Sequence, residues 1–340
     1  MALLGGCTSI PSQPGFDDVQ QTVSRRTDAT IHWNQGTQAD ERADRAVQAL
    51  IARPLSADAA AQVALLGNRR LQATFEDLGI AQADLVQAGL LSNPIFSISA
   101  RLPEAGVGST NWEMGITQNF LAILTMPLRK KVAAEALEST KLRVSAEVIQ
   151  LANDVRRQFH VVQASQRTAE LRATAARASD AALDAATRIY QSGNISSLDL
   201  SNHQALAEQA QLEMDNAQAQ LVQERARLAR LMGLRQSEWA FTLDSMILEP
   251  AAEEPDAESL IMLAESTRLD LAHARAETAV AQAELKLARP ASLSDTVQAG
   301  VDAEKEPEGF WVTGPNLAVP IPIFDLGQAA AFRAQSEYRR

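Results

Sequence analysis

The sequence predicts a mainly α-helical protein with four β-strands that form two β-hairpins. Of its 340 residues, 46% are apolar but only 4% are aromatic, a composition that favours long helices over one compact globule. Two pairs of alternating segments stand about 200 residues apart, and residues 128–190 contain no glycine or proline. A net charge of -11 argues against nucleic acid as the main partner. The sequence contains no run of 18 apolar residues, so no transmembrane helix is expected.

Residues 1–55 are expected to form a lipobox-like start followed by an extended and helical segment. Leu4 precedes Cys7 by three residues, with two glycines between them, and this resembles the lipobox of bacterial lipoproteins, in which the cysteine is lipidated. Thr8 stands where such lipoproteins carry an aspartate for inner-membrane retention, so the resemblance favours outer-membrane sorting. A secretory signal needs a longer apolar stretch than residues 2–4 supply. The alternative is an ordinary thiol in a flexible terminus.

The rest of this segment, up to residue 55, is expected to be partly irregular. Residues 9–33 show no hydrophobic periodicity and are expected to lie as an irregular segment over other elements. Residues 38–52 predict a helix stopped by Pro54. Because Cys7 is the only cysteine, an internal disulfide framework and a multi-cysteine metal site are excluded.

Residues 56–92 predict a helical region, with Ser56 as N-cap and a break at residues 67–68. Residues 93–120 follow as the first β-hairpin, because apolar and polar residues alternate with period two in both of its arms. The intervening residues 103–110 hold two glycines and a proline, which is typical of a turn.

A second helix and β-hairpin repeat this order. Residues 269–289 predict a helix stopped by Pro290, and residues 293–324 predict a second hairpin. Ile80-Ala-Gln-Ala-Asp-Leu85 aligns without gaps on Val280-Ala-Gln-Ala-Glu-Leu285, so the chain reads as two related halves. The alternative is coincidence between alanine-rich helices.

Residues 128–232 predict a long antiparallel helical hairpin. At about 1.5 Å per residue, the stretch free of glycine and proline would be a rod of roughly 90 Å. Gly193 breaks it, Ser196 or Ser197 is the candidate N-cap of the returning helix, and Gly233 ends that helix. Residues 233–268 connect to the second half, with a short extended piece at 239–243 and a short helix after Asp256.

The strand pairs indicate a membrane and an oligomer. Strands of eight to ten residues with alternate apolar positions can cross a bilayer when tilted. Four strands cannot close a barrel, and an open edge in lipid leaves backbone groups unsatisfied, so copies of the chain would share one barrel. The alternative is a soluble sheet with one face exposed to water. The residues expected to face lipid are Phe96, Ile98, Trp112, Met114, Val297, Val301, Leu317 and Val319.

The order of elements, the strand exits at residues 119–128 and 319–327, and the tip at residues 190–199 together resemble the TolC family of outer-membrane efflux proteins. The segment Gln87-Ala-Gly-Leu-Leu-Ser-Asn-Pro94 is most similar to the heavy-metal efflux branch of the family. The resemblance implies a homotrimer with a twelve-stranded barrel in outer-membrane lipid and a helical tunnel through the periplasm. It also implies a periplasmic adaptor and an inner-membrane efflux pump as partners, with the pump selecting the substrate.

The resemblance assigns the tip residues Tyr190, Gly193, Leu198 and Asp199 to adaptor docking. Gly193 and Asp199 could equally serve only to end one helix and begin the next. By the repeat, a second helical hairpin is expected from Gly327, of which residues 327–340 are the start; we therefore expect an incomplete copy in which no gating residue can be named.

Three other hypotheses fit the sequence less well. A periplasmic adaptor also has a helical hairpin, but it lacks two strand pairs this far apart, and a cytoplasmic coiled-coil scaffold does not explain the strands. An enzyme is disfavoured because His32, His160, His203 and His273 are scattered and no nucleophile or phosphate-binding motif occurs. No cofactor, metal site or catalytic residue is therefore predicted.

Overall fold

The computed structural model describes residues 11–102, 110–120, 122–244, 256–294, 297–306, 309–319, 321, 323 and 326–339. It separates into two compact units. One comprises residues 1–16, 76–143 and 263–340, and the other comprises residues 17–75 and 144–262. Cys7 and Thr8, on which the lipidation prediction rests, lie outside the described residues, as does most of the predicted turn at 103–110.

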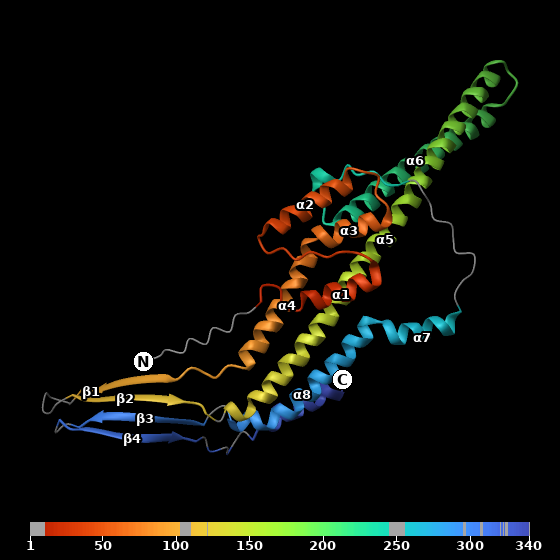
Figure 1. Cartoon of the computed structure of the whole chain (residues 1–340). Coiled ribbons are helices and arrows are strands. Elements are labelled where there is room, and N and C mark those ends of the chain that lie inside the picture. Colours follow the sequence, from red (N-terminus) through yellow and green to blue (C-terminus); the bar gives the residue numbers. More distant parts are fainter. Residues whose placement is uncertain are drawn as a thin grey trace. The chain divides into compact units, whose positions relative to one another are not determined.

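The first unit contains a four-stranded antiparallel sheet (Figure 1). Its strands are β1 (Ile95–Arg101), β2 (Asn111–Gln118), β3 (Gln298–Lys305) and β4 (Trp311–Ala318), in the order β1-β2-β3-β4. Ile98 pairs with Met114, Ile116 with Val301, and Ala299 with Leu317. The two predicted hairpins therefore join through β2 and β3 into one sheet.

Helices enter and leave this sheet in the same order in both halves. α4 (Arg69–Ala88) precedes β1 and α5 (Ala122–Gln191) follows β2, while α8 (Leu269–Ser294) precedes β3 and α9 (Gln328–Arg339) follows β4. α4 and α8 begin 200 residues apart, as do α3 (Ala57–Gly67) and α7 (Ala257–Thr267). The spacing found in the sequence thus recurs in the elements themselves.

Two helix boundaries differ from those predicted, and both involve proline. α5 begins at Ala122 rather than Leu128, because the Asn119 side-chain oxygen accepts a hydrogen bond from the Ala122 N–H (3.0 Å) and so caps the helix early. Pro127 then lies inside the helix. α8 continues to Ser294, past Pro290. A proline removes one helical hydrogen bond but does not bar the following residues from helical geometry.

The second unit contains α1 (Phe16–Thr27) from residue 17, α2 (Gln38–Ile51), α3, α5 from residue 144, and α6 (Ser197–Met232). α1 corrects the prediction of an irregular segment at 9–33. Its buried residues are Phe16, Val19 and Val23, and their spacing of three and four residues is typical of a helix. Twelve residues are too few for this periodicity to stand out among polar neighbours.

Asn68 links the beginning of α4 to the end of α6. Its side-chain oxygen accepts hydrogen bonds from the N–H groups of Arg70 (2.8 Å) and Leu71 (3.1 Å), which caps α4. Its side-chain amide donates to the Leu231 carbonyl at 2.8 Å. Gly233 ends α6 with φ +75°, and a Cβ at Gly233 would lie 2.8 Å from the Asn68 Cα. Glycine is therefore required here by both conformation and space.

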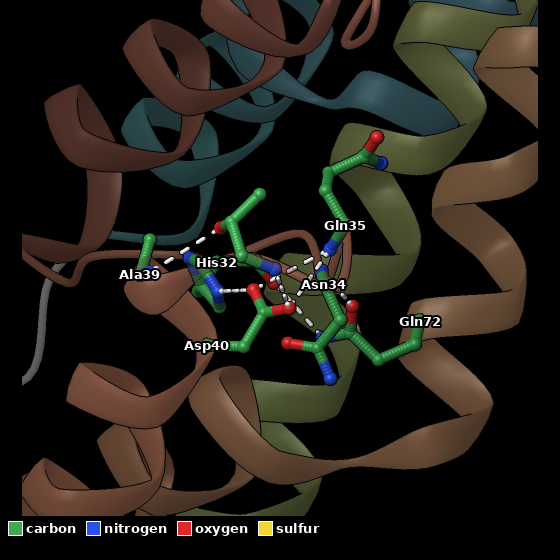
Figure 2. Close-up of polar contacts among 7 residues, drawn as sticks. His32, Asn34, Gln35, Ala39, Asp40 and Gln72 are labelled. Atoms are coloured by element: carbon green, nitrogen blue, oxygen red, sulfur yellow. Dashed lines mark hydrogen bonds and ion pairs between the residues drawn. The ribbon is translucent and has the colours of Figure 1, made fainter.

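An extended strap, residues 29–35, lies against α2, α3 and α4 (Figure 2). The His32 Nε2 is 2.7 Å from Asp40 Oδ1, while Gln72 donates to the His32 carbonyl and accepts from the Asn34 N–H, both at 2.8 Å. Trp33 is buried beside Phe75, with ring centroids 6.2 Å apart. Side chains thus supply the hydrogen bonds that this strap does not receive from a sheet.

Candidate functional site

The sheet has one apolar and one polar face. Directly opposed residues in antiparallel strands share a face, and residues alternate between faces along each strand. The register gathers onto one side a set that is apolar except for Thr313, with the polar Gln118 and Lys305 at its two ends: Phe96, Ile98, Ala100, Trp112, Met114, Ile116, Ala299, Val301, Ala303, Trp311, Thr313, Pro315 and Leu317. Phe96, Val301 and Leu317 are 62%, 60% and 69% exposed, so nothing in the described chain covers this face.

Six of the eight residues expected to face lipid lie on this face within strands. The other two lie just outside. Val297 precedes β3, which begins at Gln298, and Val319 follows β4, which ends at Ala318. Alternation alone predicts a strand at Val297, but in the structure α8 extends to Ser294 and β3 begins only at Gln298.

The opposite face carries a polar cluster that the sequence analysis did not identify. Arg101 lies 3.0 Å from Glu113 and 3.9 Å from Glu304, and the Asn111 amide donates to Glu304 at 2.6 Å. These residues come from β1, β2 and β3, so only the register brings them together. The available signal was opposite charge at the polar alternate positions of three strands.

The polar face is crowded at Gly300 and Gly115 but open at Gly314, whose Cβ position has no neighbour within 4 Å. A Cβ at Gly300 would lie 2.2 Å from the Ile116 carbonyl oxygen and 2.8 Å from Thr117 Cγ2. A Cβ at Gly115 would lie 3.0 Å from Ser97 Oγ. Glycine at positions 300 and 115 therefore lets the neighbouring strands approach closely.

Both edge strands have one unpaired side within the described sheet. β1 pairs with β2 and β4 pairs with β3, and neither has a second neighbour there. An exposed edge is a template for a further strand. Because all neighbours are antiparallel, pairing β4 of one copy with β1 of the next would continue the same pattern.

The helical hairpin ends in a tightly capped turn. Gly193 has φ +78° and donates to the Tyr190 carbonyl at 2.9 Å. Ser196 caps α6: its Oγ accepts from the Asp199 N–H at 3.1 Å, and the Asp199 carboxylate accepts from the Ser196 hydroxyl at 2.6 Å. These hydrogen bonds from Ser196 hold the pKa of Asp199 below its ordinary value.

Apolar side chains remain exposed around this turn, among them Ile189 at 43%. Tyr190 is 42% and Leu198 69% exposed. Gly193 and Asp199 thus shape the turn, and Tyr190 and Leu198 present a surface. The four tip residues lie together in one unit, while the strand residues lie together in the other, so the chain has two distinct candidate sites.

No helix among the described residues is long and apolar enough to cross a bilayer. Within the same described residues, no group of three or more His, Cys, Asp and Glu side chains is placed to hold a metal ion.

Comparison with known families identifies the family to which this fold belongs. The sequence model of the outer membrane efflux protein family matches residues 60–234, which include α4, the first hairpin of the sheet and the helical hairpin. The chain belongs to the outer membrane efflux protein family. The predicted mainly helical fold with four strands is confirmed, and so are the TolC-like resemblance and the outer-membrane location.

Individual relatives agree with the family. The chain is 26% identical over 303 residues to the cobalt-zinc-cadmium resistance protein CzcC of Cupriavidus metallidurans, covering 84% of this chain and 69% of CzcC. The crystal structure of CusC, a protein that undergoes conformational changes accompanying folding and transmembrane channel formation, is similar with a TM-score of 0.57 and 17% identity, over 87% of this chain and 70% of CusC. The outer membrane protein VceC of Vibrio cholerae is similar with a TM-score of 0.60 and 12% identity, over 88% of this chain and 73% of VceC.

Proposed function

We propose that three copies of this chain form an outer-membrane channel that exports substrates delivered by an inner-membrane pump through a periplasmic adaptor. The observation that carries the proposal is the four-stranded sheet with one apolar face, one polar face and two open edges. In lipid, each unsatisfied backbone group costs several kcal/mol. Three copies would supply twelve strands, pair every edge and place the polar face toward an aqueous lumen.

The substrate class we propose is divalent transition-metal cations. Support comes from the similarity to CzcC, whose name gives cobalt, zinc and cadmium, and from the phrase at residues 87–94, which is similar to the heavy-metal branch. The carboxylates of Glu113 and Glu304 on the polar face are compatible with cation passage but do not select a metal. Selection would lie in the pump.

The tip residues Tyr190 and Leu198 are proposed to contact the adaptor. Their exposure on a rigid turn suits an adaptor that docks end-on, since exposed apolar side chains on a fixed scaffold lose little entropy on binding. We also propose that Cys7 is lipidated. Mass spectrometry of chain produced behind a complete secretory signal tests this, because an unmodified Cys7 would contradict it.

The channel proposal is tested by fractionation and conductance. We expect chain exported to the periplasm to require detergent for extraction from outer membranes, to have the mass of three copies, and to conduct ions in a planar bilayer. Chain that stays in the soluble periplasmic fraction without conductance would contradict the channel and favour the adaptor or scaffold readings. Cobalt, zinc and cadmium sensitivity of a host that has the pump and adaptor but lacks this chain tests the substrate class.

A further inference from the structure

Exposed apolar side chains gather at the end of the sheet where the helices attach. β1 and β3 begin at this end, and β2 and β4 finish there. The connections to the helices leave large apolar side chains between 41% and 71% exposed. We call six of them the collar: Leu90, Leu91, Phe120, Ile123, Leu124 and Leu326. Exposed apolar groups beside an apolar sheet face suit the boundary of a bilayer.

Two lysines follow the collar on the same face of α5. Lys130 lies seven residues after Ile123, and Lys131 lies seven residues after Leu124. Seven residues are about two helical turns, so each lysine shares a face with a collar residue about 10 Å away. Both lysines are exposed. Side chains on a helix lean toward its N-terminus, which on α5 is the end at the sheet, so the amino groups reach back toward the collar.

The charge of these lysines is not neutralised by their own helix. Residues 122–134 of α5 contain no acidic residue, and within the described chain the recorded ion pairs of α5 begin at Glu138. The last eight residues of α4 contain one acid, Asp84. The three consecutive cations Arg129 to Lys131 thus form a basic segment in a chain whose net charge is -11.

The two lysines differ from Arg129 in what they contact. The Arg129 guanidinium donates to the Ala122 carbonyl at 2.8 Å, so it is engaged within the helix. Lys130 is positioned by its stem, because a Cβ at Gly89 would lie 3.3 Å from Lys130 Cδ. The stem therefore runs across the turn that leads to Leu90, and the amino group extends beyond it. An apolar stem on the protein with a charged head beyond it is how lysines reach a membrane interface.

The face that carries Lys130 is also the face that the N-terminal segment contacts. Lys141 lies eleven residues, or about three turns, after Lys130, and a Cβ at Gly15 would lie 2.8 Å from Lys141 Cε. Cys7 precedes Gly15 by eight residues, a reach of at most about 28 Å. Because Lys141 and Leu124 are roughly 26 Å apart along α5, a lipid on Cys7 can reach the collar on the side of Lys130.

We propose that Lys130 and Lys131 bind the headgroup of an anionic phospholipid in the periplasmic leaflet of the outer membrane, while Ile123 and Leu124 contact its acyl chains. The inference rests on the proposed function, since it names a lipid that the channel binds where it leaves the membrane. A phosphodiester accepts charge-assisted hydrogen bonds from ammonium groups. Each lysine near an anionic lipid surface adds to the attraction, and three copies would present six.

Native mass spectrometry of the detergent-purified chain tests this site. We expect phosphatidylglycerol to bind at least tenfold more tightly than phosphatidylcholine, and the double variant Lys130→Gln, Lys131→Gln to lose that preference. The matched control, Arg25→Gln with Arg26→Gln, removes two adjacent exposed cations from α1 and should keep the preference. Lys130→Arg with Lys131→Arg should keep it too. A preference that survives the glutamine pair, or an equal loss in the control, would overturn the proposal.

Salt supplies a second readout if the glutamine pair does not assemble. Ionic attraction predicts that the preference of the unaltered chain shrinks as ionic strength rises, and a preference independent of salt would contradict the site. The native mass and the conductance of the same sample separate this inference from the channel proposal. A conducting assembly of three copies without a preference for phosphatidylglycerol contradicts the lipid site alone, whereas a monomer without conductance contradicts both.

Discussion

Gly300 on β3 lies so close to Ile116 on β2 that a Cβ at Gly300 would be 2.2 Å from the Ile116 carbonyl oxygen. The contact is with backbone, which cannot rotate away as a side chain would. The close approach of β2 and β3 at this point therefore requires glycine at position 300.

Gly300→Ala is expected to destabilise the folded chain by about 2–4 kcal/mol, because the clash would separate β2 from β3. Urea unfolding in detergent micelles measures it. Gly314→Ala is the matched control: it lies in the same sheet, and nothing lies within 4 Å of its Cβ position, so we expect a change within about 0.5 kcal/mol. Equal effects of the two substitutions would show that close packing at Gly300 is not what joins the hairpins.

A second matched pair separates conformation from crowding at helix ends. Gly193 and Gly233 have nearly the same φ, +78° and +75°, but only Gly233 has neighbours, at Asn68. Gly193→Ala should cost about 1 kcal/mol for the left-handed backbone, and Gly233→Ala at least about 2 kcal/mol more. Thermal unfolding followed by circular dichroism makes the comparison; similar costs would refute a packing role for Gly233.

The His32–Asp40 pair predicts acid sensitivity of the strap. Burial raises the pKa of the Asp40 carboxyl, but hydrogen bonds from His32, Thr37, Gln35 and Gly36 together lower it below its ordinary value. A lowered folded-state pKa means that the stabilisation is fully present above the unfolded-state pKa, about 4, and is lost as pH falls below it.

Amide hydrogen exchange at Asn34 and Gln35, corrected for intrinsic rates, should therefore accelerate below about pH 4. Asp40→Asn should accelerate it already at pH 7, with a loss of about 1–2 kcal/mol from the cap. Asp44→Asn, exposed on the same helix, is the control and should leave the strap unchanged. Unaltered exchange in Asp40→Asn would show that the pair does not hold the strap.

At the hairpin tip, Leu198 is expected to contact the adaptor, whereas Asp199 is expected to cap α6. Leu198→Asp should weaken adaptor binding at least tenfold, because an exposed apolar contact is lost, while the three-copy assembly stays intact. Asp199→Ala removes the capping box and should fray the first turn of α6. Surface plasmon resonance with the purified adaptor measures the first effect. Unchanged adaptor affinity in Leu198→Asp would remove the tip from the docking surface.

Much of this fold is predictable because its signals are local. Alternation at Phe96, Ile98, Trp112 and Met114 marks strands whatever they pair with, and Gly193 marks the turn because few other residues adopt its φ. The strand that pairs with β2 was not predictable, since register depends on residues far apart in sequence.

The failures have physical causes as well. Pro290 is expected to end a helix, but α8 continues to Ser294, because a proline removes one helical hydrogen bond without barring the residues after it from helical geometry. The cluster of Arg101, Glu113 and Glu304 forms only after the hairpins join.

The central claim, that the apolar face of the sheet meets lipid and the polar face meets water, is tested most directly by spin labels in reconstituted bilayers. Labels at Phe96, Ile98, Val301 and Leu317 should be relaxed by oxygen dissolved in the lipid, and labels at Ser97, Ser99, Asp302 and Asn316 by a water-soluble nickel chelate. Equal access of the two relaxing agents to both sets would contradict the account.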